Sequence, residues 1–422
     1  MKYFSTRTSS FHKTLSEAIL NGLAPDGGLF IPEFFPKVDL NKIPAHLSYP
    51  HFAEYILQPY FEQDFLQSYL TDICERAFNF PIPLHQLNET DYVLELFHGP
   101  TLSFKDIGAR FLAECLEVLA KKITIMVATS GDTGSAVAGA FYHKKNINVI
   151  ILYPQGKISK RQEHQITCWG DNVLALAIEG TFDDCQRLVK AAFLDPWWKD
   201  NLHVSSANSI NIGRLLPQMT YFAYHSFQFY LKHHAMPGFI VPTGNLGHAT
   251  AAYWAKLMGF PIREIVLATN ANQPIADYLK TGEFKPRPSV ATLANAMDVG
   301  NPSNFERLKY LYSDWEVFKK QVKLVSATDV DIKKMIKEKD QEYGRIICPH
   351  TATAFFARQQ FADNAWIMVA TADACKFEEV IEPIIGRAIP IPAQMKTMLN
   401  KPSVIKVVKP ELSEIKKIIN SG

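Results

Sequence analysis

The stretch HGPTLSFKD, residues 98–106, places one lysine, Lys105, among hydroxyl side chains, a glycine and a proline. It follows the apolar run YVLELF and precedes IGARFLAECLEVLA, a segment whose apolar spacing predicts a helix. A lysine amine at such a corner can act as a base or form a Schiff base with a carbonyl group, once burial or neighbouring charges lower its pKa. Taken alone, the motif favours a simpler interpretation, a solvated lysine in a first helical turn.

Two further corners combine small residues with the predicted start of a helix. SGDTGS at 130–135 follows the apolar run ITIMVAT, and GNLGH at 244–248 follows GFIVPT. Small residues leave backbone N–H groups uncovered, and the first turn of a helix favours an anion. Neither corner has the spacing of a nucleotide P-loop or of a dinucleotide fingerprint. Each alone is consistent with a tight turn and a good helix cap, but their combination with Lys105 favours a binding site for an anionic ligand.

The elements that must position these residues are short apolar runs separated by amphipathic segments. Runs this apolar, alternating with predicted helices such as 133–145 and 247–259, indicate an α/β protein with parallel sheet buried on both faces. Ligands in such sheets bind at the carboxyl ends of the strands, where all three corners would lie. The predicted strands are 92–97, 123–129, 147–153, 172–178, 202–207, 238–243, 263–269 and 365–371.

The chain has 422 residues, more than one hydrophobic core usually holds, so at least two domains are expected. Its organisation changes near residue 85. The region 1–85 is rich in proline and aromatic residues and has helical spacing at 51–70, whereas the α/β alternation occupies the rest. We therefore predict an N-terminal domain at 1–85 and a catalytic region at 86–422.

Charge and cysteine usage limit the class of protein. Lys plus Arg is 44 and Asp plus Glu is 42, a formal charge of +2, so we expect no binding to nucleic acid or to an anionic membrane. No apolar run approaches the ~18 residues that a membrane span requires. The six cysteines are scattered without a Cys-x-x-Cys pair, which suits reduced thiols in a cytoplasmic protein better than a disulfide framework or a zinc site.

Together, HGPTLSFKDIGARF, ATSGDTGSA and PTGNLGHATAA resemble the motifs of the threonine synthases, in particular the longer bacterial and fungal type. The opening YFSTRTSSFHKTLSEAILNGLAPDGGLFIPE is similar to the N-terminal domain of that type, so the likeness covers nearly the whole chain and leaves no cleaved transit peptide upstream. The resemblance implies the tryptophan-synthase β-like fold of pyridoxal 5'-phosphate (PLP) enzymes, fold type II. Two α/β subdomains with parallel or mixed sheets would then hold the cofactor between them.

The resemblance also implies residue roles. Lys105 would form the Schiff base with the cofactor, and Asp132 would lie near the cofactor's 3′-oxygen. Thr371 would face the pyridine nitrogen, although the family often has Thr-Ala-His-Pro-Ala-Lys-Phe where this chain has TADACKF. His248 is as well explained as an exposed residue of a helix start. The loop expected to bind the cofactor phosphate consists of Gly244, Asn245, Leu246, Gly247 and His248.

The implied substrate is O-phosphohomoserine, whose phosphate requires a second anion site. SSANSINIGRLLPQ matches the substrate-phosphate segment of the family, with Asn208 and Arg214 as the aligned residues and Ser130 and Thr133 as further contributors. The implied reaction is γ-elimination of phosphate and β-addition of water to give threonine. The alternatives are a phospholyase or threonine dehydratase of the same fold, and a catalytically silent binding protein. The oligomeric state, monomer or dimer, does not follow from the sequence.

Overall fold

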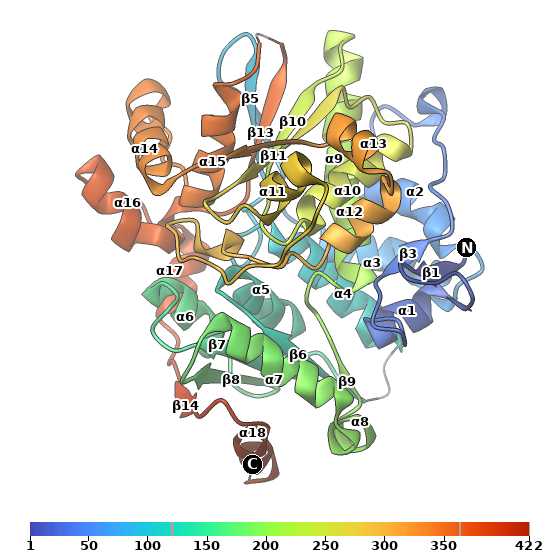
Figure 1. Cartoon of the computed structure of the whole chain (residues 1–422), viewed down its shortest axis with the longest axis vertical. Helices are drawn as coiled ribbons and strands as arrows, with labels where there is room; N and C mark the ends of the chain where they lie inside the picture. The colour runs from blue at the N-terminus through green and yellow to red at the C-terminus, as the bar shows by residue number, and fades with distance from the viewer. Residues whose placement is uncertain (120–121, 363, 422) are drawn as a thin grey trace.

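A computed structural model describes residues 1–119, 122–362 and 364–421 of the chain. Its strands form an antiparallel N-terminal sheet, β2-β1-β3, and two larger sheets (Figure 1). The six-stranded sheet, β12-β11-β10-β13-β5-β4, is parallel except for β4, and the five-stranded sheet, β14-β8-β7-β6-β9, is parallel throughout. The strands are β1 (Tyr3–Ser5), β2 (His12–Lys13), β3 (Phe30–Pro32), β4 (Leu84–Gln86), β5 (Asp91–Glu95), β6 (Ile123–Ala128), β7 (Ile147–Pro154), β8 (Val173–Ile178), β9 (Val204–Ser205), β10 (Gly238–Pro242), β11 (Glu264–Thr269), β12 (Lys323–Ser326), β13 (Trp366–Ala370) and β14 (Lys406–Val408).

Helices cover both faces of the two larger sheets. Because successive side chains of a strand point to opposite faces, Leu94 and Phe239 join the core beneath α9 and α10, whereas Val93 and Ile240 join the core beneath α14 and α15. In Figure 1, α7 lies in front of the five-stranded sheet. The hydrophobic core that α7 shares with this sheet also includes a residue of α18. The helices are α1 (Leu15–Asn21), α2 (Tyr49–Phe61), α3 (Leu70–Ala77), α4 (Lys105–Leu119), α5 (Asp132–Phe141), α6 (Lys160–Thr167), α7 (Phe182–Leu194), α8 (Pro196–Leu202), α9 (Ile212–His233), α10 (Gly247–Leu257), α11 (Pro274–Thr281), α12 (Phe305–Leu311), α13 (Trp315–Gln321), α14 (Asp329–Tyr343), α15 (Pro349–Arg358), α16 (Glu378–Ile385), α17 (Ala393–Leu399) and α18 (Leu412–Ser421), with short 3₁₀ turns η1 (Leu40–Lys42), η2 (Phe65–Tyr69), η3 (Asn295–Met297) and η4 (Ala374–Phe377).

The predicted α/β class and the buried parallel strands are confirmed, with two local corrections. The strand expected at 202–207 is only Val204–Ser205, because α8 continues to Leu202 and His203 then adopts a left-handed conformation. The helical spacing at 51–70 is interrupted after α2, where Gln63 has a φ of 63°. No helix in the described part of the chain is long and apolar enough to cross a membrane.

The order of the strands brings the predicted corners together. β10, β13 and β5 are neighbours in the six-stranded sheet, and their parallel direction places their carboxyl ends along one edge. The 244–248 loop, Thr371 and the segment leading to Lys105 follow these three strands. The SGDTGS corner follows β6 of the other sheet, so α5 approaches the same region from the opposite side and packs against α4.

The N-terminal region contributes a small sheet and helices α1 to α3, which pack against α4 and α9. We retain as a proposal the division of the chain into 1–85 and 86–422. At that division, β4 pairs with β5 in antiparallel register, Leu84 opposite Leu94, so the chain enters the six-stranded sheet at this point.

Candidate active site

Lys105 is the first residue of α4. The segment before it is hydrogen-bonded to the residues that follow β13. The backbone N–H of Phe104 donates to the carbonyl of Thr371 at 2.8 Å, and Asp373 N–H donates to the carbonyl of Leu102 at 3.1 Å. The carboxylate of Asp106 accepts from the backbone N–H and the hydroxyl of Thr101 at 2.9 and 2.5 Å. Asp106 therefore organises the turn before Lys105.

The amine of Lys105 has no hydrogen-bond or ion-pair partner among the described residues; it lies 5.3 Å from the centre of the Phe104 ring. Burial lowers the pKa of Lys105 to about 8, opposed by the Asp132 carboxylate and reinforced by Lys376 and Arg214. A lysine with such a pKa is partly unprotonated near neutral pH, as a nucleophile or base must be. The solvated lysine that the motif alone favours does not describe this environment.

Asp132 begins α5 and is almost fully buried. Its Oδ1 is 2.8 Å from the amine of Lys376 and accepts from Gln162 Nε2, also at 2.8 Å. Burial alone would raise the pKa of Asp132, but the charges of Lys376 and Lys105 hold it well below its usual range. Lys376, which is completely buried, also donates to the carbonyl of Thr101 at 2.9 Å and so connects the SGDTGS corner to the segment before Lys105.

The GNLGH loop turns into α10 through a left-handed residue, Leu246, with φ 60° and ψ −1°. No side chain caps this helix, so its first amides are available to an anion. A Cβ atom on Gly244 would come within 2.6 Å of the Cα of Met297, and one on Gly247 within 3.2 Å of Asn304 Nδ2. The glycines therefore permit a close approach of backbones. The side chain of Asn245 is engaged away from the loop, with Ser209 and Ser303.

His248 is buried, and its alternative interpretation as an exposed residue is wrong. Its ring stacks on Phe104, with centroids 4.4 Å apart and planes at 22°, and its Nδ1 is 3.2 Å from the carbonyl of Pro242. Burial lowers the pKa of His248 to about 3, with a further contribution from Lys105, so the ring is neutral. The other ring nitrogen, Nε2, is buried without a partner among the described residues.

Arg214 lies in the first turn of α9 and is 2% exposed. Its Nη1 donates to the carbonyl of Ala207, its Nε is buried without a partner, and no carboxylate of the described residues forms an ion pair with it. Burial lowers its pKa to about 10, so the guanidinium is charged at neutral pH. Asn208 donates to the carbonyl of Ala128 at 3.0 Å and thereby ties its segment to the end of β6.

The remaining predicted residues have free hydroxyl groups. The side chains of Ser130, Thr133 and Thr371 form no hydrogen bond with the described residues, although Thr371 N–H is 3.4 Å from Thr351 Oγ1. Sequence reasoning gave no role to three residues that the fold brings to this region: Lys376, Gln162 and His350. His350, in the first turn of α15, accepts from Ala296 N–H at 3.1 Å through Nε2. Pro349, directly before His350, is typical of the first position of a helix, but nothing in the sequence indicates that this helix begins near Asp132.

Buried polar atoms without partners indicate that these surroundings fit an additional polar group. They are His248 Nε2, Arg214 Nε, His350 Nδ1 and Ser103 Oγ. The first three belong to residues that lie close enough to Lys105 for electrostatic coupling with it, and the fourth lies two residues before Lys105. Buried polar groups are rarely left unpaired in a protein. With the uncapped start of α10 and the lowered pKa of Lys105, they match a cofactor that has both a phosphate and an amine-reactive carbonyl, as PLP does.

Comparisons with known proteins agree with this chemistry. Residues 77–370 match a family model described as pyridoxal-phosphate dependent enzyme, residues 2–78 one described as threonine synthase N terminus, and residues 349–419 one described as threonine synthase, C-terminal. A threonine synthase of Serratia marcescens is 38% identical over 428 residues, covering 99% of each chain.

Solved structures give the same result. The crystal structure of threonine synthase from Escherichia coli superposes with a TM-score of 0.92 at 34% identity, covering 100% of both chains. That of PLP-bound threonine synthase from Brucella melitensis also has a TM-score of 0.92, at 32% identity, and covers 100% of this chain and 99% of the other. The chain therefore belongs to the threonine synthase family of pyridoxal-phosphate-dependent enzymes.

Proposed function

We propose that this enzyme converts O-phosphohomoserine and water to threonine and phosphate, with Lys105 as the catalytic lysine. The observation that supports it most directly is a pair of cations, of which Lys105 is half-buried and Arg214 is buried. Lys105 supplies a reactive amine, and Arg214 supplies a guanidinium that has no carboxylate partner among the described residues. A substrate with an amino group and a phosphate would engage both. Arginine suits the second task because its fork binds phosphate oxygens bidentately.

The residues that would hold the cofactor approach from three strand ends. The amides of Gly244, Asn245, Leu246 and Gly247, with His248 Nε2, would bind its phosphate, Asp132 would lie near its 3′-oxygen, and Thr371 would donate to its ring nitrogen. When bound, pyridoxal phosphate supplies the electron sink that stabilises negative charge next to the substrate's amino group.

The chain's own residues would perform the proton transfers and the binding. The amine of Lys105 is the basic group of the site and would accept and return the protons of the substrate carbons. Arg214, Asn208 and the hydroxyls of Ser130 and Thr133 would hold the substrate phosphate as it leaves. We also propose a cytoplasmic location, supported by six separate cysteines that are all buried thiols.

Product analysis tests the activity. Purified enzyme supplied with O-phosphohomoserine should release phosphate and threonine in equal amounts. Formation of 2-oxobutyrate and ammonia instead would identify a phospholyase, and absence of any turnover would contradict the proposal.

The Arg214→Leu variant tests the substrate-phosphate site. Loss of a hydrogen bond to a charged group costs about 1.5–3 kcal/mol, so kcat/KM for O-phosphohomoserine should fall by roughly one to two decades. Slow reactions of a non-phosphorylated amino acid and the absorbance of the bound cofactor should not change. A parallel fall in both activities would point to a folding defect, and unchanged turnover would remove Arg214 from the site.

A further inference from the structure

Four polar residues join the two loops that are proposed to bind phosphate groups. Ser209 Oγ accepts from Asn245 Nδ2 at 2.7 Å and from Asn304 Nδ2 at 3.1 Å. Arg307, on α12, donates from Nη1 to Asn304 Oδ1 at 2.7 Å and to the carbonyl of Ser209 at 3.1 Å, and from Nη2 to the carbonyl of Ile210 at 2.7 Å. We call Ser209, Asn245, Asn304 and Arg307 the loop clamp.

The loop clamp connects segments that are far apart in the sequence. Asn245 lies within the proposed cofactor-phosphate loop, and Ser209 directly follows Asn208 of the proposed substrate segment. Ser303 N–H donates to Asn245 Oδ1 at 2.6 Å, so both ends of that side-chain amide are fixed. The Nε of Arg307 donates at 3.0 Å to the carbonyl of Phe30 in β3 of the N-terminal sheet.

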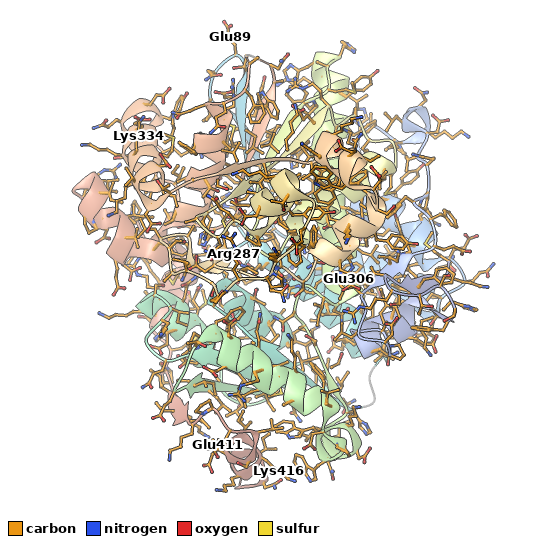
Figure 2. All side chains as sticks on the ribbon, in the orientation of Figure 1. Glu89, Arg287, Glu306, Lys334, Glu411 and Lys416 are labelled. Atoms are coloured by element: carbon orange, nitrogen blue, oxygen red, sulfur yellow. The ribbon has the colours of Figure 1, made fainter. Side chains whose placement is uncertain are left out.

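Burial of the Arg307 guanidinium at this position is energetically unfavourable. Its side chain is completely buried, and its hydrogen-bond acceptors are neutral oxygens rather than carboxylates. Burial of a charge without an opposite charge is costly, and apolar packing is often a more stable alternative. A planar fork with fixed donors does, however, hold several backbone segments in one geometry, which a lysine cannot do. Its neighbour Glu306, labelled in Figure 2, is partly exposed and pairs with Arg7 at 2.9 Å.

We propose that the loop clamp is a positioning device that fixes the distance between the cofactor-phosphate loop and the substrate-phosphate segment. The inference rests on the proposed function, because that function assigns one anion to each segment. A substrate held at both ends reacts only if the two sites are correctly spaced, and a misplacement of about 1 Å can cost about 10²-fold in rate. Each site alone would tolerate the same displacement.

The Ser209→Ala variant tests the clamp with the smallest change. It removes one hydroxyl and leaves the side-chain amides of Asn245 and Asn304 without their shared acceptor. We expect kcat/KM for O-phosphohomoserine to fall about tenfold or more. The rate of cofactor loss on dialysis and the reaction of a non-phosphorylated amino acid should stay close to the wild-type values, whereas the urea midpoint should fall because the buried amide of Asn304 loses an acceptor.

Variants of two arginines complete the test. Arg307→Met and Arg307→Lys should both lower kcat/KM for O-phosphohomoserine more than they lower the other readouts, because the fork and not only its charge is required. The matched control is Arg7→Met, which breaks the exposed ion pair between Arg7 and Glu306, the residue next to Arg307 on α12. This variant should behave as wild type.

The outcomes separate the clamp from the function on which it rests. Wild-type enzyme that makes no threonine from O-phosphohomoserine would contradict the proposed function before any variant is considered. With an active wild type, unchanged kcat/KM in Ser209→Ala, or an equal fall in both activities and in cofactor retention, would overturn the positioning role. If Arg307→Met does not fold, Ser209→Ala decides alone.

Discussion

At the scale of single residues, the region around Lys105 contains more positive than negative charge. Lys376 and Arg214 both lie close enough to Lys105 to lower its pKa. Among the described residues, the carboxylates that oppose these cations are Asp132 and Asp106, and Asp106 is already bound to Thr101. Burial raises the pKa of Asp106, opposed by its hydrogen bonds from Thr101. Such an excess of buried cations is costly by itself and is relieved by anionic ligands. Two phosphate groups, one from the cofactor and one from the substrate, would supply that charge.

The pKa of Lys105 can be measured directly. In enzyme freed of its cofactor, the reaction of Lys105 with an amine reagent should rise with pH and level off above about 8, whereas exposed lysines should titrate near ~10.4. Asp132→Asn removes the negative charge that raises this pKa, so its titration should move to lower pH. Competitive labelling followed by peptide mass spectrometry gives both values. A Lys105 that titrates with the exposed lysines would contradict the lowered pKa of this amine.

Residue roles could be proposed from the sequence only where a local motif or a family resemblance suggested them. Lys105 stands in a recognisable strand-to-helix corner, and Arg214 was identified by the similarity of its segment to a family. Lys376 and His350 were not assigned, because their roles depend on tertiary contacts with Asp132, which lies more than 200 positions away in the chain. No periodicity or spacing can show such a contact.

At the scale of elements, strands with long apolar runs were predicted well and short edge strands were not. β7, with eight residues, was predicted almost to the residue, but β12 and β14, with four and three residues, were missed. Such short strands contain too few side chains to show an alternating pattern. The backbone conformation within loops was also not predictable from the sequence. The left-handed residue of the 244–248 loop is Leu246, although a glycine is the residue that ordinarily favours that conformation.

The packing of that loop against η3 leads to a prediction about cofactor retention. In Gly244→Ala, the new Cβ would lie 2.6 Å from the Cα of Met297, so one of two backbones must move. Overpacking of this kind costs about 1–3 kcal/mol, which is roughly one to two decades in the dissociation constant of the cofactor. Dialysis followed by cofactor absorbance measures the loss.

A second glycine separates this effect from a general loss of stability. Gly386 follows α16 with φ 71° and has open space around it, so Gly386→Ala should cost stability through backbone strain alone, about 1–2 kcal/mol. It should retain its cofactor as wild type does. Equal retention in Gly244→Ala and wild type would show that the phosphate binds elsewhere.

At the scale of the whole molecule, the candidate site depends on contacts between the two larger sheets. Asp132 opens a helix that follows β6 of the five-stranded sheet, and Lys376 follows β13 of the six-stranded sheet. Around their ion pair, Ser159 Oγ donates to the carbonyl of Lys376 at 2.8 Å, and Arg161 pairs with Glu378 at 3.2 Å. The two halves are thus held together beside the reactive lysine by polar contacts rather than by apolar packing alone.

Removal of one partner of this ion pair should therefore destabilise the whole enzyme. Lys376→Met leaves the Asp132 carboxylate buried without its nearest opposite charge, a change that typically costs about 3–5 kcal/mol of the free energy of unfolding. The double variant Lys376→Met/Asp132→Asn removes both charges and should recover part of that loss, because no unpaired carboxylate remains. Because the wild-type pair holds the pKa of Asp132 below its unfolded value, its stabilising effect is present above about pH 4 and declines as the pH falls below it. Urea unfolding of the wild type, Lys376→Met, Asp132→Asn and the double variant at pH 7 measures the coupling. A double variant less stable than Lys376→Met alone would show that the two charges do not act as a pair.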